Sequence, residues 1–225
     1  MNKNRTFSII IKTVAIISSL YGMSWSFLNK EFLTYFTNLS NIAIDLCLII
    51  SLVLVIRRKK PSNSWYIIKY LMTISILLTF LIYLCVLAPT DKRGFIGAYT
   101  DKCCASLCVH FITPLLSILD FILFDYEFRQ KKIYALYATI PPLIYVGYVL
   151  ILAQVFNVRW SDDMLAPYNF INYGAECGWF GFAPETISSK TLGIGVFYMI
   201  IVLCIIFILL GLLLLWLSKL RKKHI

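Results

Sequence analysis

His110 and Thr37 are the two side chains in this sequence that could support catalysis together. An imidazole with a pKa near neutrality can take a proton from a hydroxyl group, and the activated oxygen can then attack an acyl carbon. Further hydroxyl and amide groups follow Thr37 at helical spacing, at Ser40 and Asn41. Each of these polar residues, taken alone, is also consistent with an ordinary hydrogen bond between helices.

The two residues are expected at matching depth in the membrane. Thr37 lies in the apolar stretch 31–56 and His110 in the stretch 103–125. If both helices enter from the outer face, the two side chains lie roughly 10 Å below it. The sequence therefore predicts an outward-opening polar pocket. Its candidate lining groups or oxyanion donors are Asn38, Ser40, Asn41 and Tyr145.

A second set of ionisable residues is expected nearer the inner face, at Lys12, Asp45, Lys69 and Asp120. Charges at membrane depth are costly, so each is a candidate for function. One hypothesis is that the two aspartates pair with the two lysines as a structural polar layer. The alternative is that the lysines extend to the headgroups and the aspartates accept separate hydrogen bonds.

These residues must be positioned by membrane helices. Of the 225 residues, 60% are hydrophobic and only 14% are charged, and the mean hydropathy is +0.81. A soluble chain of this size could not bury so much apolar surface, so the composition excludes a soluble enzyme and a disordered chain. The predicted fold class is an all-α polytopic membrane protein, because helices satisfy their own backbone groups in lipid.

Six apolar stretches are long enough to span a bilayer. They predict a single transmembrane domain over residues 1–225, with helices near 6–28, 31–56, 65–88, 103–125, 133–156 and 194–218. Thirteen of the 21 Lys and Arg residues lie in the termini and in the second and fourth connections, against six on the opposite side. The positive-inside rule therefore places both termini in the cytoplasm.

The net charge of +10 follows from this topology and from anionic headgroups. We therefore expect membrane lipids as partners and no nucleic acid. The Lys-, Ile- and Asn-rich composition is typical of an AT-rich genome and favours a bacterial plasma membrane as the location.

The outer connections at 89–102 and 157–193 carry aromatic residues that fit either an interfacial belt or a lid over the pocket. A disulfide could join Cys103 or Cys104 to Cys177 on this oxidising side, but the sequence does not determine the pairing. With two histidines and no paired ligand spacing, we expect no metal site and no cofactor. A third catalytic member could come from a loop acid, or the pair could act as a dyad without one. The loop acids are Asp91, Asp101, Asp162, Asp163 and Glu176.

Several short motifs resemble those of one family of six-helix membrane proteins. Residues 35–41, Tyr-Phe-Thr-Asn-Leu-Ser-Asn, resemble its F-T-x-x-S-N segment. Residues 110–114, His-Phe-Ile-Thr-Pro, followed by Asp120, resemble its H-x-x-x-P…D segment. Residues 142–145, Pro-Leu-Ile-Tyr, and residues 167–170, Pro-Tyr-Asn-Phe before Gly174, are similar to its later motifs. The family includes bacterial proteins and is related to the androgen-induced and ADTRP proteins.

The relatives are transmembrane threonine hydrolases that act on fatty-acid esters of hydroxy fatty acids. The resemblance therefore implies Thr37 as nucleophile and His110 as base, with a lipid-like ester as substrate. Asn169 and the cysteine-rich outer loop depart from the family pattern, and neither departure affects this pair.

Three alternatives remain open at this point. A lipid acyltransferase would use the same pair with a lipid alcohol as acceptor. A small transporter or proton relay would use Asp45, His110 and Asp120, although the chain has no internal repeat of the kind common in transporters. The third alternative is a scaffold or sensor without catalytic activity.

Overall fold

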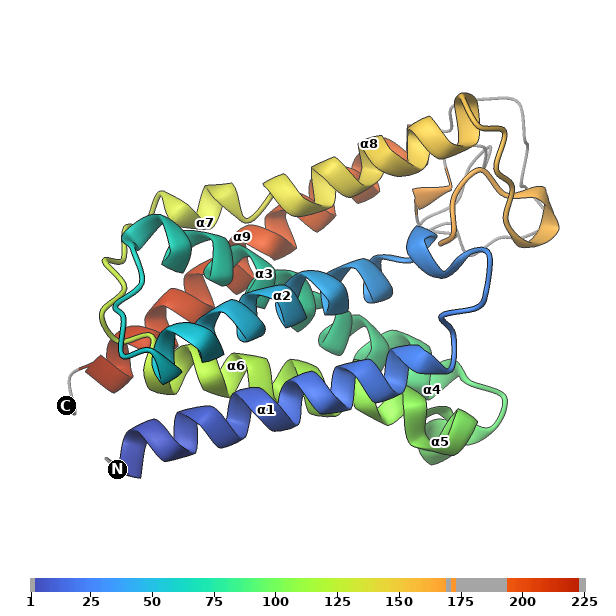
Figure 1. The fold of residues 1–225 in the computed structure, drawn as a ribbon. Coiled ribbons are helices and arrows are strands. Elements are labelled where there is room, and N and C mark those ends of the chain that lie inside the picture. Colours follow the sequence, from blue (N-terminus) through green and yellow to red (C-terminus); the bar gives the residue numbers. More distant parts are fainter. Residues whose placement is uncertain (1–2, 169–170, 173–193, 223–225) are drawn as a thin grey trace. The chain divides into compact units, whose positions relative to one another are not determined.

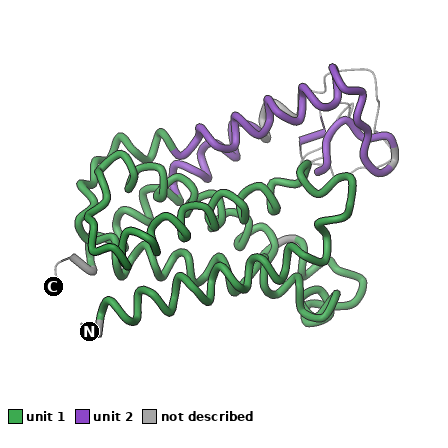
Figure 2. Tube along the Cα trace, in the orientation of Figure 1, with its two compact units in different colours: residues 1–137, 210–225 green, residues 138–209 purple. Residues whose placement is uncertain are grey.

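The computed structural model describes residues 3–168, 171–172 and 194–222. Its regular secondary structure in these ranges is helical throughout. The sequence predicts one transmembrane domain over 1–225, and the structure groups the residues into two compact units (Figure 2). Unit 1 comprises residues 1–137 and 210–225, and unit 2 comprises residues 138–209. The two units are described separately.

Six described helical stretches are long and apolar enough to cross a membrane, as expected of an integral multi-pass membrane protein. They are Asn4–Ser24, Phe36–Ile56, Asn63–Thr90, Gly94–Phe124, Tyr134–Gln154 and Ile200–Leu220. The fourth begins at Gly94, earlier than the predicted boundary at 103. The reason is that most of α5 (Gly94–Leu107) is helical, with a break at residues 101–104.

Four helices form the core of unit 1 (Figure 1). They are α1 (Lys3–Ser24), α2 (Phe36–Ile56), α3 (Asn63–Ile82) and α6 (Thr113–Phe124). α1 and α3 each pack against both α2 and α6, so the four helices surround a common interior. The short helix α7 (Tyr134–Tyr137) and the last part of α9 (Ile194–Lys222) also belong to this unit.

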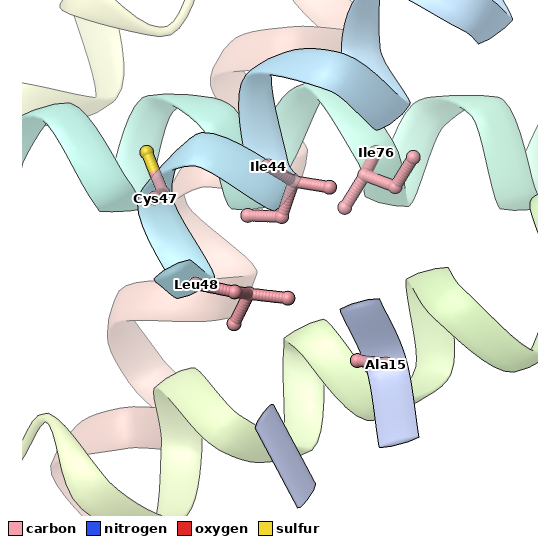
Figure 3. Close-up of a cluster of buried hydrophobic side chains, with 5 residues drawn as sticks. All are labelled: Ala15, Ile44, Cys47, Leu48 and Ile76. Atoms are coloured by element: carbon pink, nitrogen blue, oxygen red, sulfur yellow. The ribbon is translucent and has the colours of Figure 1, made fainter. Parts of the chain in front are cut away.

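A cluster of apolar side chains occupies the middle of this interior. Ala15 from α1, Ile44 and Leu48 from α2, and Ile76 from α3 are fully buried together with Cys47 (Figure 3). We call these five residues the apolar layer. Along α1, its member Ala15 lies between the polar residues Lys12 and Ser19.

Two helices of unit 1 widen into π-helical turns, and each turn precedes a proline. Tyr83–Leu87 continues α3 and is followed by Pro89 in α4 (Ala88–Thr90), while Cys108–Ile112 continues α5 and is followed by Pro114. A proline has no N–H to donate, and its ring clashes with the carbonyl four residues earlier. The backbone therefore makes i to i−5 bonds instead, from Ala88 to Tyr83 and from Thr113 to Cys108. Such turns occur frequently at functional sites.

The segments that carry most of the basic residues meet at one end of unit 1. Arg5 donates to the carbonyls of Val55 and Ile56 at the end of α2. The connection after α2 meets the connection after α6 through an ion pair of 2.8 Å between Lys60 and Glu127. We call this the basic end, and the opposite end of these helices the far end.

The connection at the far end is folded around Arg93. Its guanidinium binds Asp91 and Asp101, each at 2.8 Å. Hydrogen bonds from Arg93 lower the pKa of Asp91 to about 2. Lys102, Cys103 and Cys104 follow with positive φ angles, which is uncommon for non-glycine residues. Both cysteines are free thiols among the described residues, and their proposed partner Cys177 lies outside those residues.

Unit 2 contains α8 (Ile140–Gln154), the 3₁₀ turn Ser161–Asp163 and residues 194–209 of α9. α8 begins with Pro141 and Pro142 in its first turn, where a missing N–H leaves no helical bond unmade. The segment after α8 is tied back to it by Arg159, which donates to the carbonyl of Ala153 at 2.8 Å. Most of the predicted aromatic loop 157–193 lies outside the described residues.

Candidate functional site

His110 lies at the centre of the π-helical turn Cys108–Ile112. Its ring stacks on Tyr83, the first residue of the other π-helical turn, with centroids 3.7 Å apart and planes 9° from parallel. The Nδ1 atom is buried and has no hydrogen-bond partner. An unpaired buried polar atom is rare in folded proteins, so this imidazole is a candidate for chemistry rather than for packing alone.

Tyr83 is itself held in a fixed position. Its hydroxyl donates to the carbonyl of Ala98 at 2.7 Å and is hydrogen-bonded to Ser106. Its ring also contacts Tyr99 edge-to-face, with centroids 5.0 Å apart. These contacts come from α5 and fix the aromatic surface on which His110 rests.

The other support for the His110 segment comes from α1. Ser18 and Tyr21 donate to the carbonyls of Cys108 and Cys103. Gly22 lies so close to this segment that a Cβ would be 2.6 Å from Val109 Cγ1 and 2.8 Å from the Ala105 carbonyl oxygen. Only glycine fits this contact without displacing the backbone next to His110.

We therefore expect Gly22→Ala to destabilise the protein by about 1–3 kcal/mol, as overpacking does. Helix propensity alone would predict a gain of about 0.5–1 kcal/mol. Gly147→Ala in α8 is the matched control, because a Cβ there meets nothing within 4 Å. Thermal unfolding in detergent measures both variants, and equal stabilisation by the two would contradict the close packing of α1.

Thr37 lies in the first turn of α2, at the far end of unit 1, and is partly exposed. Its carbonyl accepts hydrogen bonds from Ser40 at 3.0 Å and Asn41 at 2.8 Å. Among the described residues its hydroxyl makes no hydrogen bond, and neither does the ring of His110. Thr37 and His110 are thus not hydrogen-bonded to each other in this structure. Both the hydroxyl and the imidazole nitrogens are available for a substrate.

Asn41 connects the segments that carry this pair. Its amide nitrogen donates to the carbonyl of Thr37 and, at 3.3 Å, to the carbonyl of Val109, the residue before His110. The N–H groups of Asn41 are therefore used by backbone carbonyls. This corrects its interpretation as an oxyanion donor, because in this conformation it joins the two helices instead.

The other predicted lining residues differ in what they contact. Asn38 donates to the carbonyl of Phe32 at 2.8 Å. Ser40 is hydrogen-bonded to Thr79 of α3 at 3.0 Å as well as to Thr37, which is the ordinary interhelical role. Tyr145 belongs to unit 2, where its ring lies 6.4 Å from that of Tyr168.

The loop acids considered as a third catalytic member are engaged elsewhere or lie outside the description. Asp91 and Asp101 bind Arg93, and Asp163 lies 3.8 Å from Arg159. The structure does not describe Glu176 or the side chain of Asp162. Among the described residues, no carboxylate is hydrogen-bonded to His110.

Near the basic end, the structure brings Lys12, Lys69 and Asp120 together. Lys12 Nζ lies 2.5 Å from Asp120 Oδ1, and Lys69 Nζ lies 2.7 Å from Asp120 Oδ2. Asp125 binds Lys69 at 2.5 Å, and Lys12 donates to Ser8 at 2.7 Å. We call these five residues the ionic network. Both lysines are at most 1% exposed, so they pair inside the protein rather than extend to its surface.

Asp45 is not part of the ionic network, which corrects the hypothesis that it pairs with a lysine. The polar residue of α1 next to Asp45 is Ser19. Ser19 follows Lys12 by seven residues, which is about 10 Å along the helix. Ala15 of the apolar layer lies between Lys12 and Ser19 along α1. Asp45 is 4% exposed, and neither of its carboxylate oxygens has a hydrogen-bond partner at normal distance.

Sequence reasoning missed Tyr83 and Asp125. The prolines could have indicated Tyr83. Pro114 follows the turn that carries His110, and Pro89 follows the turn that carries Tyr83 in the adjacent span. Asp125 is the last residue of the predicted stretch 103–125, and it is not among the ionisable residues expected at membrane depth. It lies five residues after Asp120, outside the i+3 and i+4 positions that share a helical face, so helical spacing does not predict that both carboxylates contact Lys69.

In the part of the chain that the structure describes, no group of three or more His, Cys, Asp or Glu side chains is arranged to hold a metal ion. Comparisons with protein-family models, with curated proteins and with solved structures find no match to this chain.

Proposed function

We propose that the chain is a membrane-embedded hydrolase of lipid-like esters, with Thr37 as nucleophile and His110 as general base. The observation that carries this proposal is the half-buried imidazole of His110, whose buried Nδ1 has no hydrogen-bond partner. It lies in a π-helical turn and stacks on Tyr83 of a second π-helical turn. The hydrogen bonds of Asn41 to Thr37 and Val109 support it, because they tie the two helices at this level. The motif resemblance to the threonine hydrolases points to the same pair.

The proposed reaction has two steps. In the first, Thr37 Oγ attacks the ester carbonyl, its proton passes to the imidazole, and the alcohol leaves with that proton. In the second, water gives a proton to the imidazole and attacks the acyl-threonine, which releases the fatty acid and restores the hydroxyl. Catalytic hydrogen bonds that are absent without substrate commonly form in its complex, so the open Thr37–His110 geometry is compatible with this role.

The location of the pair favours a lipid-like substrate. The partly exposed Thr37 lies at the far end of the span α2, where an acyl chain can enter laterally from the bilayer. By the positive-inside rule the basic end is cytoplasmic, so the proposed pocket opens to the outer face. We keep the bacterial plasma membrane as the proposed location.

Acyl transfer would use the same pair, with a lipid alcohol in place of water in the second step. A proton relay through Asp45, His110 and Asp120 is a second candidate, favoured by the unpartnered carboxyl of Asp45. The environment of Asp120 argues against a relay, because its ion pairs with two buried lysines stabilise the charged carboxylate.

The test is labelling of the detergent-purified protein with a lipophilic fluorophosphonate. We expect labelling of the wild type and its loss in Thr37→Ala, with Ser40→Ala as the matched hydroxyl control that remains labelled. Each variant is first checked for an unchanged melting temperature. Wild-type protein that does not react, or equal labelling of Thr37→Ala, would contradict the proposal.

A further inference from the structure

Asp45 presents an unusual environment that the proposed reaction does not use. It lies near the middle of α2 and is 4% exposed, and neither carboxylate oxygen has a hydrogen-bond partner at normal distance among the described residues. A carboxylate at membrane depth is costly unless something neutralises it. A proton, a neighbouring cationic side chain or a bound ion can neutralise it.

No neighbouring cation in the described residues serves Asp45. Lys12 is bound to Asp120 and Ser8, and Lys69 to Asp120 and Asp125. Along α1, Ala15 lies between Lys12 and Ser19, and it packs with Ile44 and Leu48 of α2 (Figure 3). Every other described ion pair lies in an exposed connection.

The groups around Asp45 instead present oxygen atoms. Ser19 of α1 is fully buried, and its hydroxyl is the side-chain hydrogen-bonding group next to the Asp45 carboxylate. Its Oγ also lies 3.3 Å from Oδ1 of Asn41, which precedes Asp45 by one helical turn. Because the N–H groups of Asn41 donate to the carbonyls of Thr37 and Val109, its oxygen is the atom left on the Ser19 side.

We propose that Asp45, Ser19 and Asn41 form a binding site for a small monovalent cation of the Na⁺ type. Carboxylate, amide and hydroxyl oxygens are ligands that hard cations prefer. One carboxylate supplies one negative charge, which a monovalent ion balances. The ion would join α1 to α2 one turn below the Asn41 hydrogen bonds, and the proposal does not depend on hydrolase activity.

The test is the melting temperature of the purified protein against NaCl, with choline chloride keeping the ionic strength constant, at pH 8.5. We expect a rise of about 5–10 °C over a hundredfold range of Na⁺ above its dissociation constant. Asp45→Asn removes the charge that needs the ion, so it should melt at one temperature at all Na⁺ concentrations, near that of the Na⁺-loaded wild type.

Ser51→Ala is the matched control, because Ser51 is another buried hydroxyl of α2 and is bonded to Trp65. It should retain the full response to Na⁺. A wild-type melting temperature that depends on pH but not on Na⁺ would show that Asp45 simply holds a proton, and would overturn the proposal. A Na⁺ response that persists in Asp45→Asn would overturn it as well.

Discussion

Asp120→Asn will destabilise the protein by about 3–5 kcal/mol, the loss expected when one partner of a buried ion pair is removed. Asp120 lies between Lys12 and Lys69, and it is the only member of the ionic network that contacts both lysines. Without its charge, two fully buried ammonium groups face each other across a neutral amide. The melting temperature in detergent measures the loss.

A compensating variant separates charge balance from general disruption. Lys12→Met combined with Asp120→Asn leaves Lys69 paired with Asp125, so the buried charges cancel again. We expect the double variant to recover most of the stability, in a non-additive manner. Glu127→Gln breaks the exposed pair with Lys60 and should leave the melting temperature unchanged. Equal effects of Glu127→Gln and Asp120→Asn would contradict the role of the network.

His110→Phe will lower ester hydrolysis by about 10²- to 10⁴-fold while it leaves the fold intact. Phenylalanine keeps a flat ring to stack on Tyr83 but has no nitrogen to accept a proton. The Nδ1 atom has no partner to lose, so its removal leaves no other group unpaired. Release of fatty acid from a lipid ester in proteoliposomes measures the rate.

Tyr83→Phe is the matched control for His110→Phe. It keeps the stacked ring and removes only the hydroxyl that binds the carbonyl of Ala98. We expect a modest loss of stability, of about 1 kcal/mol, and hydrolysis within a few-fold of the wild type. Full activity in His110→Phe would exclude the imidazole as the base.

Much of the architecture could be predicted from the sequence, because lipid leaves few choices. The apolar stretches predict helices. The predicted and observed helix boundaries agree within a few residues, except where a proline or a helix in a loop intervenes. Depth along the helix also placed Lys12, Lys69 and Asp120 in one layer, and the structure pairs them.

The partners of individual side chains could not be predicted in the same way. Counting from helix ends placed Asp45 with the lysines, although Lys12 and Lys69 pair with Asp120 and Asp125 instead. Helical spacing placed Asn41 on the same face as Thr37, but it does not say that the amide would be used by two carbonyls. The π-helical turns shift the register around His110 and Tyr83, and they depend on proline contacts that periodicity does not report.

The most direct measurement of the central claim is peptide mapping of the fluorophosphonate-labelled protein by mass spectrometry. We expect a single adduct on Thr37, in the segment that begins α2, and no adduct in His110→Phe. An adduct on Ser40 or on any other residue, or a labelled Thr37 in the absence of His110, would contradict a threonine nucleophile activated by this histidine.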